Sequence, residues 1–192
     1  MKKRLISMLL LVVMVLGMLP VTALAASSEE EALGEVNIYN GEQKLSYLSI
    51  NGRIRELIYT YFNHVDANGR TKEIPAYCVN PNIYGVPQTV GPGESIKYIA
   101  KEKGSDPKVM GIIASGYPTC GLSELKLENK YHAYYATKMA LWCYLLPNWN
   151  INNLKVNPNL TGVELQRAQK ILAAAKDIYA RGTAWNEMLS PE

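Results

Sequence analysis

The stretch Tyr134-Tyr135-Ala136-Thr137-Lys138-Met139-Ala140-Leu141-Trp142 decides how this chain is interpreted. Its apolar and aromatic residues recur at the three- and four-residue spacing of a helix, and Lys138 projects from the most apolar face. An unpaired buried charge costs several kcal/mol, against a total domain stability of about 5–15 kcal/mol. Lys138 must therefore reach solvent, find a partner, lose its proton or react.

The residues around this stretch predict a helix over residues 131–146. Asn129 is a suitable N-cap, Pro147 ends the pattern, and the helix is apolar on nearly every side, which implies burial between a sheet and other helices. Further helices are expected at residues 94–102, at 107–115 after the N-cap Asp106 and before Gly116, and at 162–180, where Thr161 and Glu164 form a capping box and Gly182 is the C-cap. Residues 117–128 are expected to form an irregular crossing.

The first half of the chain has the patterns of β-structure. Strands are expected at residues 36–39, 45–50, 56–65 and 74–79, with turns at Asn51-Gly52 and at residues 66–70. Cys78 would then lie at the end of a strand, at the rim of the sheet, just before Asn80-Pro81. Strands first and helices second predict an α+β domain.

The N-terminus has the pattern of a secretory signal peptide over residues 1–25. A basic start is followed by the apolar run 5–19 and the small-residue site Ala23-Leu24-Ala25. Residues 26–34 are expected to be a disordered leader, and residues 35–192 one domain. The protein is therefore expected to be secreted or associated with the cell surface.

Charge excludes some partners. The chain has 20 Lys and Arg residues against 17 Asp and Glu, and without Lys2, Lys3 and Arg4 the two counts are equal. The mature chain has no basic stripe, so neither nucleic acid nor an anionic membrane is expected as a partner. We also expect no cofactor and no metal, since Cys78, Cys120 and Cys143 lack metal-ligand spacing. The three cysteines could form one disulfide beside a buried thiol, or remain three buried thiols.

Three blocks of the sequence resemble a known family. They are Ala76-Tyr77-Cys78-Val79-Asn80-Pro81, Ile112-Ile113-Ala114-Ser115-Gly116-Tyr117-Pro118 and the opening stretch, 134–142, called below the first, second and third blocks. In order and spacing they resemble the thioester domains at the tips of Gram-positive surface adhesins. The resemblance implies a β-sandwich or barrel-like sheet with a helical subdomain, and attachment to an amine-bearing host or matrix protein rather than classical enzyme activity.

In that family a cysteine of the first block and a glutamine of the third block form an intramolecular thioester. Cys78 matches the cysteine, and Lys138 stands at the glutamine position. Such a bond needs a water-poor wall, for which Tyr77, Tyr135, Thr137 and Trp142 are the candidates. A lysine has no carboxamide carbon, so the ordinary thioester cannot form between these two residues.

Several possibilities for Cys78 and Lys138 follow. The domain could keep its fold without the bond; the two side chains could join through an oxidative bridge; or the bond could have other partners, such as a Lys138 amide or a thioester from Cys78 to Gln88. A cysteine hydrolase or transferase using Cys78 with His132 or His64 is a further alternative, although neither histidine has a recognisable motif.

The C-terminal end differs from the family pattern as well. Family members usually continue into further strands, a stalk and a sorting signal, whereas this sequence stops at residue 192 after a helical segment. No anchor is visible, and the sheet could lack its C-terminal strands.

Overall fold

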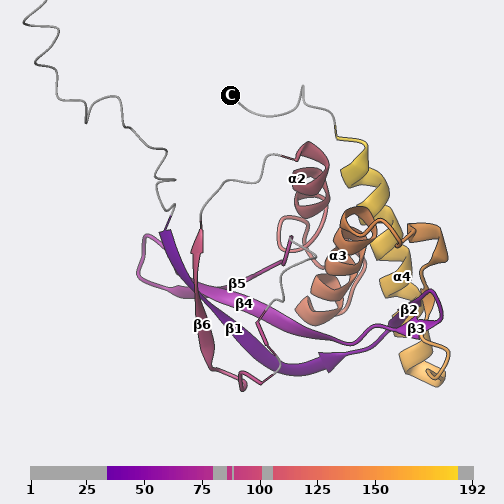
Figure 1. Cartoon of the computed structure of the whole chain (residues 1–192), viewed down its shortest axis with the longest axis horizontal. Coiled ribbons are helices and arrows are strands. Elements are labelled where there is room, and N and C mark those ends of the chain that lie inside the picture. Colours follow the sequence, from indigo (N-terminus) through magenta and orange to yellow (C-terminus); the bar gives the residue numbers. More distant parts are fainter. Residues whose placement is uncertain (1–33, 80–85, 88, 101–105, 186–192) are drawn as a thin grey trace, which may run out of the picture.

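The computed structural model describes residues 34–79, 86–87, 89–100 and 106–185 (Figure 1). The expected signal peptide, the leader up to residue 33, and Gln88 lie outside these residues. The elements in chain order are β1 (Gly34–Leu45), β2 (Leu48–Ile50), β3 (Arg53–Ile54), β4 (Leu57–Val65), β5 (Thr71–Pro75), β6 (Ser95–Ala100), α2 (Pro107–Ala114), α3 (Lys130–Leu145), the 3-10 helix η2 (Ile151–Asn153), β7 (Lys155–Val156) and α4 (Gly162–Thr183).

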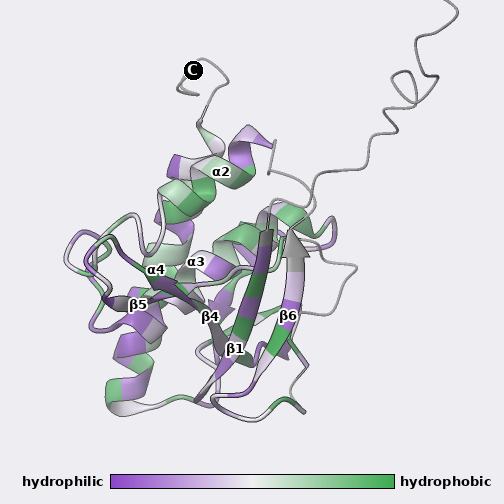
Figure 2. Cartoon of the chain, turned by 90° about the vertical axis from the view of Figure 1, so that its left-hand side faces the viewer, coloured by the Kyte–Doolittle hydropathy of each residue, from purple (hydrophilic) through white to green (hydrophobic). Residues whose placement is uncertain are grey.

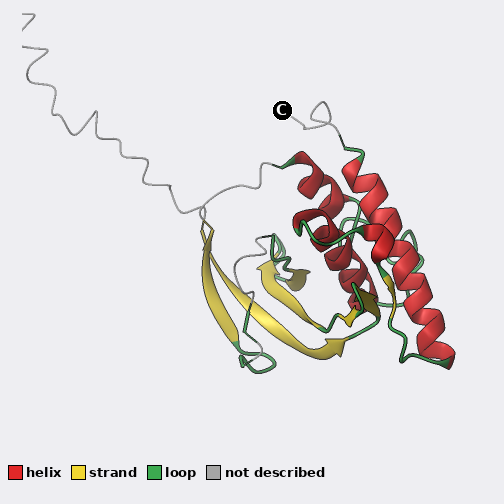
Figure 3. Cartoon of the chain, turned by 45° about the vertical axis from the view of Figure 1, so that its right-hand side comes forward, coloured by secondary structure: helices red, strands yellow, loops and turns green. Residues whose placement is uncertain are grey.

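Within the described residues the strands form two antiparallel sheets. One has the order β5-β4-β1-β6 and the other β3-β2-β7, and neither closes into a barrel in this part of the chain. The larger sheet lies to one side and the helices to the other (Figure 3). The expected α+β class is confirmed. The turn between β2 and β3 is also confirmed, because Asn51 and Gly52 have the positive φ angles of 52° and 74° that a tight hairpin turn requires.

The helix expected at residues 94–102 is wrong, because this segment contains strand β6. Strand β6 pairs with β1 along its whole length, and Ile96 lies opposite Ile38 while Tyr98 lies opposite Val36. These apolar cross-strand pairs stabilise the extended backbone. A single-sequence pattern does not contain the partner strand, so it cannot weigh them.

The strand expected at residues 74–79 ends earlier, at Pro75. Ala76 still donates its backbone N–H to the Thr60 carbonyl at 2.9 Å. Beyond it, the carbonyls of Ala76 and Cys78 accept hydrogen bonds from side chains of α3. Cys78 therefore lies in a segment that leaves the sheet and runs onto the central helix.

Helix α3 is the centre of the domain, as its sequence predicts. It contacts β4 on one side and α2 and α4 on the other, and it appears between the larger sheet and α4 in Figure 1. Every residue from His132 to Leu141 is buried. The N-cap is confirmed, since the Asn129 side chain accepts from the backbone N–H groups of Tyr131 and His132.

Helices α2 and α4 pack closely through glycine. The N-cap Asp106 of α2 is confirmed, but the expected C-cap Gly182 is wrong, because α4 continues to Thr183. A Cβ atom on Gly182 would lie 2.4 Å from the Cα atom of Ile112, so glycine is required by contact rather than by capping.

Hydrophilic and hydrophobic residues alternate along the ribbon of α4 (Figure 2), and its buried residues are Ala168, Ile171, Ala174, Ala175, Ile178 and Gly182.

The expected capping box at the start of α4 is also not formed. The Thr161 side chain makes no cap hydrogen bond, and the Glu164 carboxylate pairs instead with Arg167, which also binds Glu128 at 2.9 Å. Glu164 thus serves an ion pair along the helix instead of the helix terminus.

Candidate functional site

Cys78 lies three residues beyond the end of β5 and is half-buried. Its backbone carbonyl accepts a hydrogen bond of 3.2 Å from the indole N–H of Trp142. The first and third blocks of the sequence are therefore in direct contact, and the contact is made at the cysteine itself.

Lys138 lies in the middle of α3 and is only 9% exposed. Its Nζ donates to the Tyr134 hydroxyl at 3.1 Å, and it lies 5.4 Å and 5.8 Å from the ring centroids of Tyr134 and Trp142. It forms no ion pair with any residue in the described part of the chain. A hydrogen bond from a charged donor, worth about 1.5–3 kcal/mol, and cation–π contacts of about 0.5–2 kcal/mol each offset part of the cost of burial.

Tyr134 links this lysine to the first block. Its hydroxyl lies 2.8 Å from Thr60 Oγ1 and donates to the Ala76 carbonyl at 3.4 Å. Thr60 Oγ1 donates to the same carbonyl at 2.7 Å. Thr60 in β4 and Tyr134 were absent from the residues that the sequence singled out for the site, although the four-residue spacing between Tyr134 and Lys138 was a usable signal.

Residues 134, 138 and 142 are four apart and lie on the same face of α3. Tyr134 contacts the backbone at Ala76, and Trp142 contacts it at Cys78. Lys138 is thus bracketed by two contacts to the first block, one helical turn to either side. Its side chain faces the backbone segment that contains Cys78.

The second block joins the other two. The Tyr77 hydroxyl donates to the Tyr117 carbonyl at 2.6 Å, and the Tyr117 N–H donates to Thr137 Oγ1 at 3.0 Å. Gly116 is required here, because a Cβ atom would lie 2.4 Å from the Cγ2 atom of Thr137. All three blocks are therefore hydrogen-bonded to one another around Cys78 and Lys138, an arrangement called below the three-block cradle.

Aromatic rings form the wall of the cradle. The rings of Tyr77 and Tyr134 stack with centroids 5.1 Å apart, and burial raises the pKa of Tyr77 well above its usual value. Trp142 packs against Trp149 at 5.9 Å. Such a wall favours reactions that need water to be excluded.

A model of the thioester domain family matches residues 75–184, more than half of the chain. The chain belongs to the thioester domain family. This family comprises adhesin-type modules that form covalent links, and the match spans all three blocks of the cradle.

Solved structures with the same fold support the assignment. The thioester domain of the Enterococcus faecium TIE86 protein superposes with a TM-score of 0.55 and 20% identity, covering 80% of this chain and 51% of that one. The Bacillus anthracis TIE protein gives a TM-score of 0.53 and 18% identity, covering 80% of this chain and 25% of that one. This chain thus spans about half of the first structure and a quarter of the second. The search of curated proteins gave no match.

Tyr135, expected in the site wall of this thioester domain, lies elsewhere. Its hydroxyl donates to the Arg55 carbonyl at 2.6 Å and accepts from the Leu48 N–H at 3.1 Å. It therefore fixes α3 to the smaller sheet. The structure brings the other expected residues, Tyr77, Cys78, Thr137, Lys138 and Trp142, together in the cradle.

Neither histidine is placed to activate Cys78. His132 is buried with its Nε2 atom 3.2 Å from the Tyr47 hydroxyl, and burial lowers its pKa. It precedes Trp142, the residue that contacts Cys78, by a length of helix of about 15 Å. His64 is exposed on β4 opposite Lys72. The geometry thus gives no support to the cysteine hydrolase alternative.

The other two cysteines are buried thiols outside the cradle. The thiol of Cys120 donates to Glu124 Oε1 at 3.2 Å, and it lies 3.7 Å from the Arg181 guanidinium. Burial raises the pKa of Cys143 to about 12. Neither is in a disulfide.

The described residues contain no group of three His, Cys, Asp or Glu side chains suited to a metal, and none of the described helices is long and apolar enough to span a membrane.

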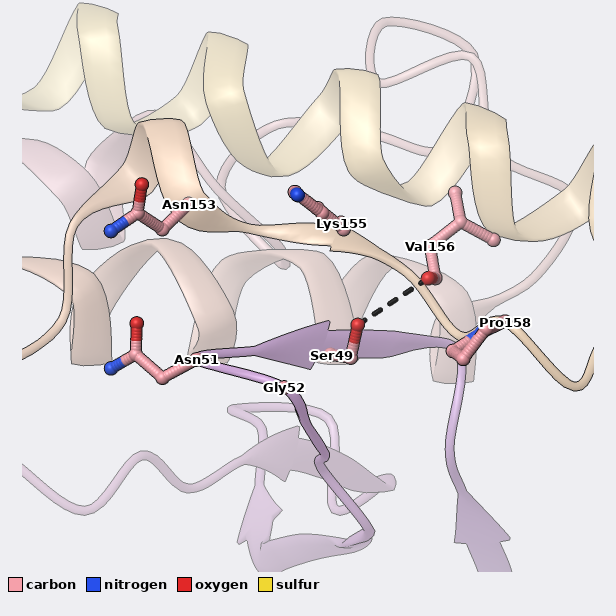
Figure 4. Close-up of a pocket in the computed structure, with 7 residues that line it drawn as sticks. All are labelled: Ser49, Asn51, Gly52, Asn153, Lys155, Val156 and Pro158. Carbon is pink, nitrogen blue, oxygen red and sulfur yellow. Dashed lines mark hydrogen bonds between the residues drawn. The ribbon is translucent and has the colours of Figure 1, made fainter.

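A separate hollow of about 460 Å³ lies at the smaller sheet, where residues of β2, of the turn after it, of η2 and of β7 line it (Figure 4). Ser49 Oγ donates to the Val156 carbonyl across it at 3.4 Å. No residue of the three blocks lines it. Its lining residues are Ser49, Asn51, Gly52, Asn153, Lys155, Val156 and Pro158.

Proposed function

We propose that this chain is an exported, cell-surface adhesin-type domain in which the ordinary Cys–Gln thioester is not formed, and that it attaches to a host or matrix protein by contact. The observation that carries the proposal is the lysine at the centre of the cradle. Lys138 occupies the position of the family's glutamine, and its amine is held by the Tyr134 hydroxyl.

The chemistry of the two side chains supports the first part. In a Cys–Gln thioester the sulfur bonds to the Cδ carbon of the amide, and ammonia leaves. The Lys138 side chain ends in a methylene group and an amine, so it has no acyl carbon for Cys78 to attack. The three-block cradle keeps the surroundings that such a bond needs, while the acyl partner is missing.

The partner and location are inferred from the family and from the N-terminus. Adhesin-type thioester domains act outside the cell, and the pattern of residues 1–25 is that of an export signal. The balanced charge of the mature chain favours a protein partner over nucleic acid or an anionic membrane.

A second candidate is a covalent bridge between Cys78 and Lys138 themselves. It is favoured by the bracketing of Lys138 between the residues that contact Ala76 and Cys78. With dioxygen as the oxidant, a thiol and an amine would give a sulfur–oxygen–nitrogen bridge and one molecule of water. Such a bridge would make the domain a self-cross-linked adhesin.

The test is the intact mass of the mature, unreduced protein with and without methylamine. We expect an unmodified mass for the natural chain, and we expect Lys138→Gln to lose one ammonia and to regain mass as a methylamine adduct. The double variant Cys78→Ala with Lys138→Gln is the control. It should neither lose ammonia nor take up methylamine.

Other masses would contradict the proposal. If the natural chain is itself short by one ammonia and takes up methylamine, a thioester to another amide, such as Gln88, is present. A gain of one oxygen with loss of two hydrogens, dependent on both Cys78 and Lys138, would establish the bridge instead.

A further inference from the structure

We propose that Cys78 and Lys138 form an acyl relay, in which the thiol takes an acyl group from a carboxylic thioester and passes it to the lysine amine. The product is an amide on Lys138. This reverses the polarity of the family's chemistry, since the domain would accept an acyl group instead of presenting one. The inference rests on the proposed function, because it needs the Cys78 thiol to carry no acyl group of its own.

Burial fixes the order of the two steps. Cys78 is half-buried, whereas Lys138 is 9% exposed and its amine is turned onto Tyr134. An external acyl donor therefore meets the thiol before the amine. The lysine amine would then receive the acyl group by transfer from the sulfur.

The bracketing contacts make that transfer intramolecular. Trp142 holds the Cys78 carbonyl at 3.2 Å, and Tyr134 holds both the Ala76 carbonyl and the Lys138 amine. The amine is thereby fixed against the segment that carries the sulfur. Reactions between groups held in this way gain greatly over their bimolecular counterparts, with effective molarities that reach about 10⁵ M or more when the groups are well oriented.

The aromatic wall protects the intermediate. An S-acyl cysteine hydrolyses when water reaches it, and the stacked rings of Tyr77 and Tyr134, with Trp142 packed on Trp149, supply apolar surface on either side of the Cys78 segment. The wall thus favours the lysine over water as the group that attacks the acyl carbon.

Both steps balance. The Cys78 thiolate attacks the carbonyl carbon of the donor thioester, the carbon–sulfur bond of the donor breaks, and the donor leaves as a thiolate. The Lys138 ammonium first gives one proton to water; the amine then attacks the same carbon, the bond to the Cys78 sulfur breaks, and the sulfur takes the proton that the nitrogen loses on forming the amide. No oxidant or cofactor is consumed, and a thioester is the suitable donor because both thiols and amines displace thiolates readily.

The experiment uses S-acetyl-N-acetylcysteamine as the probe, with intact mass, hydroxylamine treatment and peptide mapping of the mature protein. Hydroxylamine removes acetyl groups from sulfur and leaves them on nitrogen. We expect one hydroxylamine-resistant acetyl group, on Lys138. Cys78→Ser should slow the formation of this acetyl group by about 100-fold or more. In Lys138→Met the reaction should stop after the first step, with a hydroxylamine-labile acetyl group on Cys78.

Matched controls lie in the same chain. Cys143→Ala should leave acetylation of Lys138 unchanged, since this thiol is buried outside the cradle. The exposed Lys155 reports direct acetylation in the same digest. Circular dichroism of each variant establishes that it is folded.

Acetylation of Lys138 at the same rate in Cys78→Ser, or no faster than at Lys155, would overturn the relay. So would an adduct of the natural chain that remains labile to hydroxylamine. The mass of the untreated protein separates the two proposals. A thioester or bridge already present overturns the proposed function and the relay together, whereas an unmodified thiol that fails to transfer overturns the relay alone.

Discussion

Substituting Gly116 by alanine tests whether the cradle depends on the close contact between the second and third blocks. The new Cβ atom would lie 2.4 Å from Thr137 Cγ2, 2.6 Å from its Oγ1 and 3.0 Å from its Cβ. Optimal contacts between carbon atoms are about 3.5–4.0 Å, and overpacking of this kind costs about 1–3 kcal/mol. Thr137 cannot turn away freely, because its hydroxyl binds both Tyr117 and Ala133.

The magnitude follows from these contacts. If Thr137 rotates, the hydrogen bond to the Tyr117 N–H is lost, at about 1 kcal/mol, so Gly116→Ala should lower the free energy of unfolding by about 2–4 kcal/mol. Thr137→Ala alone leaves the Tyr117 N–H without its acceptor and should cost about 1–3 kcal/mol. In the double variant the two nearest atoms are gone, and the added cost of Gly116→Ala should fall below about 1 kcal/mol.

Urea unfolding of the natural chain, the two single variants and the double variant gives the coupling energy directly. We expect the double variant to be about 1–3 kcal/mol more stable than the sum of the single effects predicts. Gly121→Ala is the matched control, since nothing lies within 4 Å of its added Cβ, and it should change stability by less than about 0.5 kcal/mol. Additivity within about 0.5 kcal/mol would refute the close contact.

Two further predictions concern buried titratable groups. Burial lowers the pKa of His132. Below the usual histidine pKa of about 6.5 the unfolded chain therefore binds a proton that the folded chain does not. The free energy of unfolding should decrease as the pH is lowered, by up to about 1.4 kcal/mol per pH unit. Urea unfolding at pH 7.5 and 5 should show a smaller loss in His132→Gln, and an equal loss would contradict the assignment. Burial also raises the pKa of Cys143 to about 12, so iodoacetamide at pH 8 should label Cys78 in the folded protein and Cys143 only after unfolding.

The helical half of the fold could be predicted from local chemistry. Asp106, Asn129 and Pro147 act through their own side chains or rings on the nearest turn of the chain, so a single sequence contains the whole signal. The helix prediction for the segment of β6 was wrong because the conformation of this segment depends on pairing with β1, more than fifty residues away in the sequence. The prediction of Gly182 as a C-cap was wrong for the same reason, since this glycine is in contact with the backbone of α2.

Some residues of the candidate site could likewise be selected from the sequence, and others could not. Cys78, Lys138 and Trp142 were selected because their blocks have a recognisable order; the structure places them close together, and their role in a reaction stays a prediction. The direction of a side chain on a helix does not identify the element that covers it. Tyr135 is covered by Leu48 and Arg55, and Thr60 enters the cradle from β4, so neither position could be assigned before the strands were placed.

The contacts that hold the three-block cradle together do not depend on the side chain of Lys138. The contacts that join the three blocks are made by the side chains of Tyr77, Tyr134, Thr137 and Trp142, and none of them needs a particular group at Lys138. The Tyr134 hydroxyl, which accepts from the lysine amine, could equally bind the amide of a glutamine. A glutamine at this position would therefore place an acyl carbon in the cradle instead of an amine, without disturbing the contacts that join the three blocks. On the proposed function, Lys138→Gln should therefore allow a thioester with Cys78 to form after a single substitution.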